Sequence, residues 1–431
     1  MEEVLRLKKA TYHLWTFTIS KIISILGSNV LAFGISLYIL KMTGSATSFA
    51  INLICSILPR VILSSIAGSL ADRYSKKVII LTSQAVTVLL MGGLLIYGYV
   101  SGITVTSIYV VTALYAITST FNSVTFSSSI ACLVNEERIQ KAMSFNQMSM
   151  SIAAIGGPAI GGMMYGFVSI EVFLMVHMVA YLIAFLLEAT MDFKLYSKKG
   201  DKTEAETGMF QSLKEGFQYA KAKKAVSTIL LVALWINFFF SVLSVGGTFI
   251  LVEVLKIKSQ HVGVIESAGA VGMLVASIFL STRKQAKYPL LQSKRFILLM
   301  AITLGLTTVP LWTDLTYSVN FIYFIMIFFS FSVFGVFVNT PVGVMMQTEV
   351  EEEYRGRVYG ILEAMAMAMM PLGTMIFGLL FDHVEPQWIL LGSCIALLVI
   401  TSYMMRSSVV KQIYPELADS KIHIKEKVQH S

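Results

Sequence analysis

Long apolar stretches recur along this chain and are separated by short polar segments. A helix needs about 20 apolar residues to cross the ~30 Å hydrocarbon core of a bilayer. By this length criterion, the pattern predicts twelve membrane-spanning helices at roughly 14–40, 47–70, 78–99, 104–132, 142–167, 171–193, 226–253, 261–282, 295–312, 317–346, 358–381 and 387–405. The expected fold class is therefore an all-α membrane protein.

A longer polar segment divides these helices into two sets of six. A shift of 216 residues aligns an acidic pair and two glycines of the first set with those of the second. The aligned residues are Glu136-Glu137 with Glu352-Glu353, Gly157 with Gly373, and Gly162 with Gly378. We therefore expect two pseudo-symmetric six-helix bundles over 1–193 and 226–405. A cytoplasmic linker with an amphipathic helix is expected over 194–225, and a cytoplasmic tail over 406–431.

Composition and charge agree with a membrane environment. Hydrophobic residues make up 56% of the chain and charged residues only 13%, whereas about a quarter of a soluble domain is charged. Of the 33 lysines and arginines, 28 fall on the side of the predicted topology that holds both termini. This bias predicts a multi-pass protein of the cell membrane with both termini in the cytoplasm. The net charge of +8 forms no basic stripe, which argues against nucleic-acid binding.

Several classes of chemistry are disfavoured. The three cysteines and six histidines are scattered, so we expect no metal and no cofactor. The chain contains no Gly-Lys dipeptide, which excludes the phosphate-binding loop of an ATP-driven pump. A membrane-embedded enzyme would need convergent acidic, histidine or serine groups, and the sequence offers none. We therefore expect a protein that is not an enzyme.

The segment between the second and third predicted helices contains one acid among basic residues. Gly68, Asp72, Arg73 and Lys77 occur there in one short run. An acid in this position can face the partly positive N-terminus of a helix and hold an arginine, which would latch one side of the protein closed. The simpler alternative is a basic anchor that only sets topology.

A second motif lies in the predicted helix 142–167, where Gly157, Pro158, Gly161 and Gly162 follow closely. Proline removes a backbone donor and bends a helix, and glycines let a partner helix approach closely. The alternative is an ordinary kinked helix with small-residue packing.

These motifs resemble known signatures of the major facilitator superfamily. The first is similar to its Gly-x-x-x-Asp-Arg-x-Gly-Arg-Lys, with Ser75 and Lys76 where glycine and arginine are usual. The second is similar to the Gly-Pro-x-x-Gly-Gly of the superfamily's exporters. Arg355 and Arg357 belong to a segment that resembles the loop between helices 10 and 11 in the twelve-helix drug and macrolide efflux branch, and we expect them to take part in gating.

The resemblance implies a monomeric exporter that works by alternating access and is driven by protons. One departure limits what can be carried over. Proton-coupled exporters of this superfamily usually carry an arginine early in helix 4. Here Tyr115 and Ala116 occupy that region, and the helix predicted over 104–132 has no charged residue. Their coupling mechanism therefore cannot be transferred intact.

Charged residues at membrane depth are costly, by ~3 to above 10 kcal/mol, and usually have a function or a partner. Arg60 is expected to face an internal cavity or to form a structural ion pair. Lys21 is expected to bind substrate or to extend toward the aqueous surface. Glu266 is a candidate proton carrier. Glu188 and Glu253 lie closer to helix ends, and we expect both to be interfacial.

Four asparagines lie within helices that line the central cavity in the superfamily, and are candidate substrate contacts: Asn29, Asn122, Asn237 and Asn339. The leading hypothesis is export of an amphipathic small molecule, such as a macrolide-like antibiotic or another drug. One alternative is a dedicated exporter of a metabolite such as a siderophore, peptide antibiotic or lipid. Another is a membrane sensor that has the same fold and does not transport. The expected partners are the small-molecule substrate, protons and the lipid bilayer.

Overall fold

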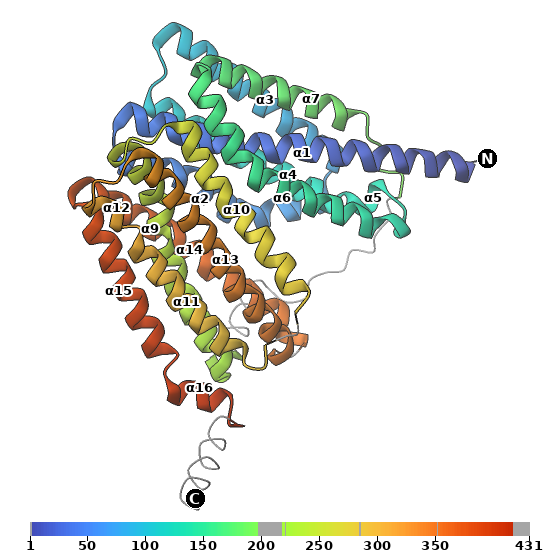
Figure 1. Cartoon of the computed structure of the whole chain (residues 1–431). Helices are drawn as coiled ribbons and strands as arrows, with labels where there is room; N and C mark the ends of the chain where they lie inside the picture. Colours follow the sequence, from blue (N-terminus) through green and yellow to red (C-terminus); the bar gives the residue numbers. More distant parts are fainter. Residues whose placement is uncertain (1, 197–217, 220, 284–285, 351, 417–431) are drawn as a thin grey trace, which may run out of the picture. The chain divides into compact units, whose positions relative to one another are not determined.

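The computed structural model describes residues 2–196, 218–219, 221–283, 286–350 and 352–416. Within these ranges every regular element is a helix (Figure 1). The first half contains α1 (Glu2–Thr43), α2 (Ala46–Arg73), α3 (Lys76–Ser101), α4 (Val105–Ser128), α5 (Ile130–Leu133), α6 (Glu136–Phe167) and α7 (Ile170–Ala189).

The second half contains α9 (Lys224–Phe249), η1 (Ile250–Val254), α10 (Ser259–Ser281), α11 (Pro289–Leu306), α12 (Val309–Trp312), α13 (Tyr317–Glu349), α14 (Glu352–His383), α15 (Pro386–Met404) and α16 (Ser407–Ile413). The element η1 is a π-helical turn that continues α9. Each of the twelve predicted spans coincides with one of the long helices.

Ten helical segments in the described part of the chain are long and apolar enough to cross a membrane. The two remaining long helices are α4, which is rich in serine and threonine, and α14, which begins with charged residues. With 24 and 32 residues, both exceed the length that a bilayer requires. The prediction of an all-α membrane fold is confirmed.

Short connections separate the first helices, and local chemistry explains where they end. Gly44 and Gly102 have φ values of +63° and +78°, which glycine adopts without steric cost. The Ser45 hydroxyl accepts a hydrogen bond from the Ser48 amide at 3.1 Å and so caps the start of α2. Thr104 and Ser107 form a reciprocal capping box at the start of α4.

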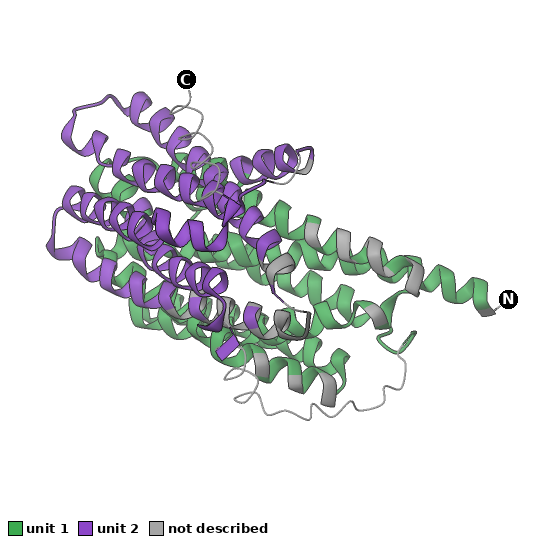
Figure 2. Ribbon diagram, turned by 90° about the horizontal axis from the view of Figure 1, so that it is seen from below, with its two compact units in different colours: residues 1–203, 248–270 green, residues 204–247, 271–431 purple. Residues whose placement is uncertain are grey.

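The chain forms two compact units, coloured separately in Figure 2. Unit 1 comprises Met1–Thr203 and Thr248–Ala270, and unit 2 comprises Glu204–Gly247 and Val271–Ser431. Within unit 1, α1 packs on α6 and α7, α2 packs on α4, and α3 packs on α4 and α7. Within unit 2, α11 packs between α13 and α15. The predicted bundle boundaries stay a prediction, and most of the predicted linker and tail (197–217, 220 and 417–431) lies outside the described residues.

Candidate functional site

A lysine within the long apolar helix α1 is buried inside unit 1. Lys21 lies on α1 and is only 3% exposed. Its Nζ donates to Ser127 Oγ on α4 at 3.1 Å and lies 5.4 Å from the centre of the Phe126 ring. Lys21 therefore ends inside the helix bundle and does not extend to the surface.

A carboxylate lies in the same region. Glu188 on α7 is completely buried. Its Oε1 accepts from Ser20 Oγ at 2.6 Å and from Gln84 Nε2 at 3.1 Å, so α1 and α3 both hold it. Lys21 directly follows Ser20, which holds Glu188, so the ammonium and the carboxylate lie in the same region, but the described side chains form no direct salt bridge between the two. We call the set Ser20, Lys21, Gln84, Asn122 and Glu188 the buried polar cluster.

One side of this cluster is incompletely hydrogen-bonded. The Asn122 amide lies beside Glu188. Within the described residues, however, Asn122 Nδ2 and Glu188 Oε2 have no hydrogen-bond partner. A buried carboxylate with one oxygen held and the other unpartnered is suited to gaining and losing a proton, because its charged form is not fully compensated.

The expectation that Glu188 is interfacial stays a prediction, and the structure adds that Glu188 is enclosed by neighbouring helices. Although Glu188 is near the end of α7, the face of α7 that carries it is covered by α1 and α3. The sequence held a usable signal: His177, Tyr181, Ala184 and Glu188 follow one another at spacings of three or four residues, and all four are buried. That spacing places them on one helix face, so Glu188 continues a polar stripe.

Two other residues of this face of α7, Tyr181 and His177, contact α1 and α4. The hydroxyl of Tyr181 is hydrogen-bonded to that of Tyr115 on α4, and it donates to the Ser24 carbonyl at 3.4 Å. The ring nitrogens of His177 lie 2.8 Å from the Phe173 carbonyl and 3.1 Å from the Gly27 carbonyl. Polar groups therefore link α1, α4 and α7 over several helical turns.

Arg60 on α2 follows Pro59 and is exposed. α2 packs on α4, the helix that carries Tyr115. Arg60 thus supplies positive charge on a helix that packs on α4, whereas superfamily exporters usually place an arginine on helix 4 itself. Arg60 lies outside the buried polar cluster, because no member of the cluster is hydrogen-bonded to Arg60.

The glycine motif of α6 lies at two close helix contacts within unit 1. A Cβ added at Gly157 would lie 2.5 Å from the Asn29 Cβ, and one at Gly161 would lie 3.0 Å from the Val30 carbonyl oxygen of α1. A Cβ added at Gly162 would lie 2.6 Å from the Ser259 carbonyl oxygen at the start of α10. The motif therefore allows α6 to approach α1 with one face and residues of α10 with another.

Glu266 on α10 belongs to unit 1 and is half-buried. Its Oε1 accepts from Thr248 Oγ1 at 3.3 Å. Among the predicted asparagines, Asn29 is half-buried beside Gly157 and Asn122 belongs to the buried polar cluster. In unit 2, Asn237 donates to the Ala233 carbonyl at 2.8 Å, and Asn339 is exposed.

The structure describes the surroundings of only some of the predicted gating residues. Lys77 Nζ donates to the carbonyls of Ala189 at 2.7 Å and Met191 at 3.0 Å, so it stabilises the negative end of α7. Gly68 has open space around it. The side chains of Asp72, Arg73, Arg355 and Arg357 lie outside the described residues.

No group of three or more potential metal ligands comes together among the residues that the structure describes. The buried polar cluster contains a carboxylate, an ammonium, two amides and the Ser20 hydroxyl, which donates to Glu188.

Comparison with known proteins gives a family and full-length relatives. A family model described as Major Facilitator Superfamily matches residues 17–374. Macrolide efflux protein A of Streptococcus pyogenes is 22% identical over 406 residues, which cover 92% of this chain and 96% of that protein. The Staphyloferrin A transporter of Staphylococcus aureus (strain NCTC 8325 / PS 47) is 24% identical over 376 residues, which cover 85% and 89%.

Among solved structures, the nucleoside transporter NupG is similar with a TM-score of 0.69 at 14% identity. The match covers 91% of this chain and 98% of NupG. At that identity the likeness concerns the fold alone.

Proposed function

Because this chain belongs to the Major Facilitator Superfamily, a family of membrane transporters, we propose that it exports an amphipathic small molecule by proton-coupled alternating access. A macrolide-like antibiotic or another drug is the proposed cargo. The observation that carries the proposal is the carboxylate of Glu188, buried near the ammonium of Lys21 inside unit 1. Macrolide efflux protein A of Streptococcus pyogenes, which aligns over 92% of this chain, supports the cargo class.

Proton coupling follows from charge balance in the buried polar cluster. With Glu188 ionised, its charge offsets that of Lys21. When Glu188 binds a proton, Lys21 is left buried without a counter-charge, which is unfavourable in a low-dielectric interior. A conformation that hydrates Lys21 is then favoured. Proton binding therefore biases the equilibrium between the two access states, as alternating access requires.

The predicted latch is part of the same proposal. Asp72 and Arg73, together with Arg355 and Arg357, would hold one access state closed, and Gly68 would give the necessary space. Lys77 would contribute indirectly, since it holds the end of α7 that follows Glu188.

A second candidate cargo is a siderophore or a similar metabolite. The specific observation in its favour is the Staphyloferrin A transporter, whose similarity spans most of both chains. Both cargo classes use the same coupling cluster, so one set of variants tests coupling for either.

The test is energised efflux from drug-sensitive bacteria that express the protein. We expect macrolide efflux that is abolished by a protonophore. Glu188→Gln, which cannot ionise, should reduce efflux to the level of cells without the transporter. Glu171→Gln is the matched control, because it makes the same change at the other end of α7, where Glu171 is only partly buried. Membrane insertion of each variant is verified by quantitative immunoblot.

The outcomes separate coupling from cargo. Protonophore-sensitive efflux that persists in Glu188→Gln would contradict the assigned proton carrier. Absence of macrolide efflux with the wild-type protein would contradict the drug cargo. Siderophore export should then be measured, and if no compound is moved, a non-transporting sensor becomes the better explanation.

A further inference from the structure

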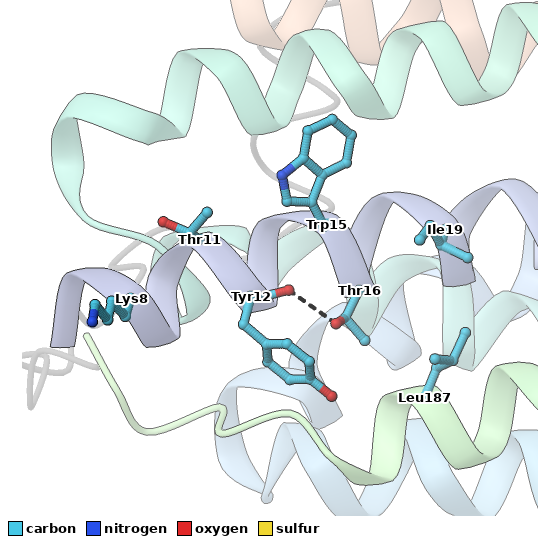
Figure 3. Close-up of a pocket in the computed structure, with 7 residues that line it drawn as sticks. All are labelled: Lys8, Thr11, Tyr12, Trp15, Thr16, Ile19 and Leu187. Carbon is cyan, nitrogen blue, oxygen red and sulfur yellow. Dashed lines mark hydrogen bonds between the residues drawn. The ribbon is translucent and has the colours of Figure 1, made fainter. Parts of the chain in front are cut away.

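A groove on the surface of unit 1 combines positive charge, aromatic rings and aliphatic side chains along one helix. It has a volume of about 540 Å³ and is lined by Lys8, Thr11, Tyr12, Trp15, Thr16, Ile19 and Leu187. Figure 3 shows Tyr12 and Trp15 pointing to opposite sides of α1, with Lys8 toward one end of the groove and Ile19 and Leu187 toward the other.

The side chains of the groove are held in place by neighbouring helices. Tyr12 Oη is hydrogen-bonded to Thr190 Oγ1 after the end of α7 at 2.8 Å. The Trp15 ring packs on Phe145 of α6, with ring centroids 5.5 Å apart. The groove is therefore a built surface between α6 and α7. Tyr12 and Trp15 nevertheless remain 50% and 53% exposed.

Positive charge gathers at the Lys8 end. Arg138 of α6 donates through Nη1 to Thr11 Oγ1 at 2.7 Å and to the Leu7 carbonyl at 3.0 Å. Both acceptors are neutral, so the charge of Arg138 is not cancelled by them. Among the described residues, neither Lys8 nor Arg138 has a carboxylate within salt-bridge distance.

Polarity changes along the groove as it does across one leaflet of a bilayer. From Lys8 to Ile19, α1 advances eleven residues, or ~16 Å at 1.5 Å per residue. Half of a ~30 Å hydrocarbon core is of similar length. A cation comes first, amphipathic aromatics follow, and aliphatic side chains lie deepest, which matches headgroup, interface and acyl chain in turn.

We propose that this groove is a binding site for an anionic phospholipid, with the lipid phosphate at Lys8, where Arg138 adds positive charge through its contact with Thr11, and one acyl chain along Trp15, Ile19 and Leu187. Charge complementarity selects an anionic over a zwitterionic headgroup, because basic pockets between membrane helices hold such headgroups. The site is separate from the buried polar cluster, and the inference does not depend on the proposed cargo or on proton coupling.

The test uses the full chain in nanodiscs and the fluorescence of Trp15. The chain has four tryptophans, so Trp235→Phe, Trp312→Phe and Trp388→Phe together leave Trp15 as the only one. Brominated phosphatidylglycerol is titrated against brominated phosphatidylcholine with the same acyl chains. We expect phosphatidylglycerol to quench Trp15 at several-fold lower mole fraction. Soluble glycerol phosphate at millimolar concentration should leave this preference unchanged, because it lacks the acyl chain.

Lys8→Gln should weaken the preference for phosphatidylglycerol about fivefold, the effect expected for one cation near an anionic membrane surface. Lys9→Gln is the matched control, since Lys9 is an equally exposed neighbour that does not line the groove. Equal quenching by both lipids, or equal effects of Lys8→Gln and Lys9→Gln, would overturn the proposal.

Native mass spectrometry of the protein with its natural tryptophans gives an independent readout. Phosphatidylglycerol should remain bound at activation energies that remove phosphatidylcholine, and Lys8→Gln should lose this retention. If retention is the same for both lipids, the groove has no headgroup selectivity and the proposal fails.

Discussion

At the scale of single residues, the buried polar cluster sets the chemistry of unit 1. A buried ion is tolerated when charge and hydrogen bonds compensate it, and removing one partner leaves the other uncompensated. Glu188 receives hydrogen bonds from Ser20 and Gln84, and Lys21 donates to Ser127. The two ions are near each other but not in direct contact. The charged form of each is therefore stabilised by the opposite charge of the other, acting through space.

This arrangement predicts coupling between the two positions. Lys21→Gln and Glu188→Gln should each lower the apparent melting temperature of the purified protein. The double variant should lose less than the sum of the two, with a coupling free energy on the order of 1 kcal/mol. Scanning fluorimetry in detergent measures all four proteins of the cycle.

The salt bridge between the exposed Lys256 and the half-buried Glu253, with Nζ and Oε2 3.1 Å apart, is the control for this cycle. Exposed pairs contribute ~0–1 kcal/mol, so Lys256→Gln and Glu253→Gln should be nearly additive. Additivity at Lys21 and Glu188 as well would mean that the two buried ions are independent.

At the scale of elements, helix packing in unit 1 depends on the glycines of α6, which have no side chain. Its glycines face backbone atoms of α1 and α10 at distances too short to accommodate a side chain. Other glycines in the same unit have open space: a Cβ added at Gly93 of α3 would meet nothing within 4 Å. The α6 glycines are therefore required by packing, while Gly93 is not.

Gly162→Ala should force α6 away from Ser259 and destabilise the protein by about 1–3 kcal/mol, the usual cost of overpacking. Gly93→Ala should leave stability unchanged or slightly raised, because alanine favours a helix over glycine. Apparent melting temperatures and efflux rates of the two variants provide the comparison. An equal loss in both would indicate that helix flexibility, and not close contact, explains the motif.

At the scale of the whole molecule, two compact units divide the chain, and the division does not follow helix boundaries. The chain passes from unit 2 to unit 1 between Gly247 and Thr248 in α9, and returns to unit 2 after Ala270 in α10. The segment between includes the π-helical turn η1 and Glu266. Unit 1 therefore contains both candidate proton carriers, Glu188 and Glu266.

The distribution of lysine and arginine predicts how the whole chain is oriented in the membrane. In a background in which Cys55, Cys132 and Cys394 are replaced by serine, a membrane-impermeant maleimide should label Lys41→Cys in intact cells. Lys411→Cys should react only after the membrane is permeabilised. The reverse pattern would place the termini outside and invert the proposed direction of transport.

The sequence by itself determined the fold class and the number and order of the long helices. Helix length and apolar content are local properties, because each span must satisfy its own backbone in lipid. The motifs around Asp72 and Pro158 likewise indicated the superfamily before any contact was known. Lys21 could be selected as a candidate because a charged residue within an apolar run can be recognised from the sequence alone.

Only the tertiary structure decided which of these residues meet. Glu188 lies near a helix end, and its burial depends on the neighbouring α1 and α3, which no local pattern reveals. Arg60 lies on a helix that packs on α4, which carries Tyr115, and the groove at Lys8 exists because α1 packs on both α6 and α7. Burial and pairing are properties of faces brought together from distant segments, so they depend on packing and not on the composition of any one helix.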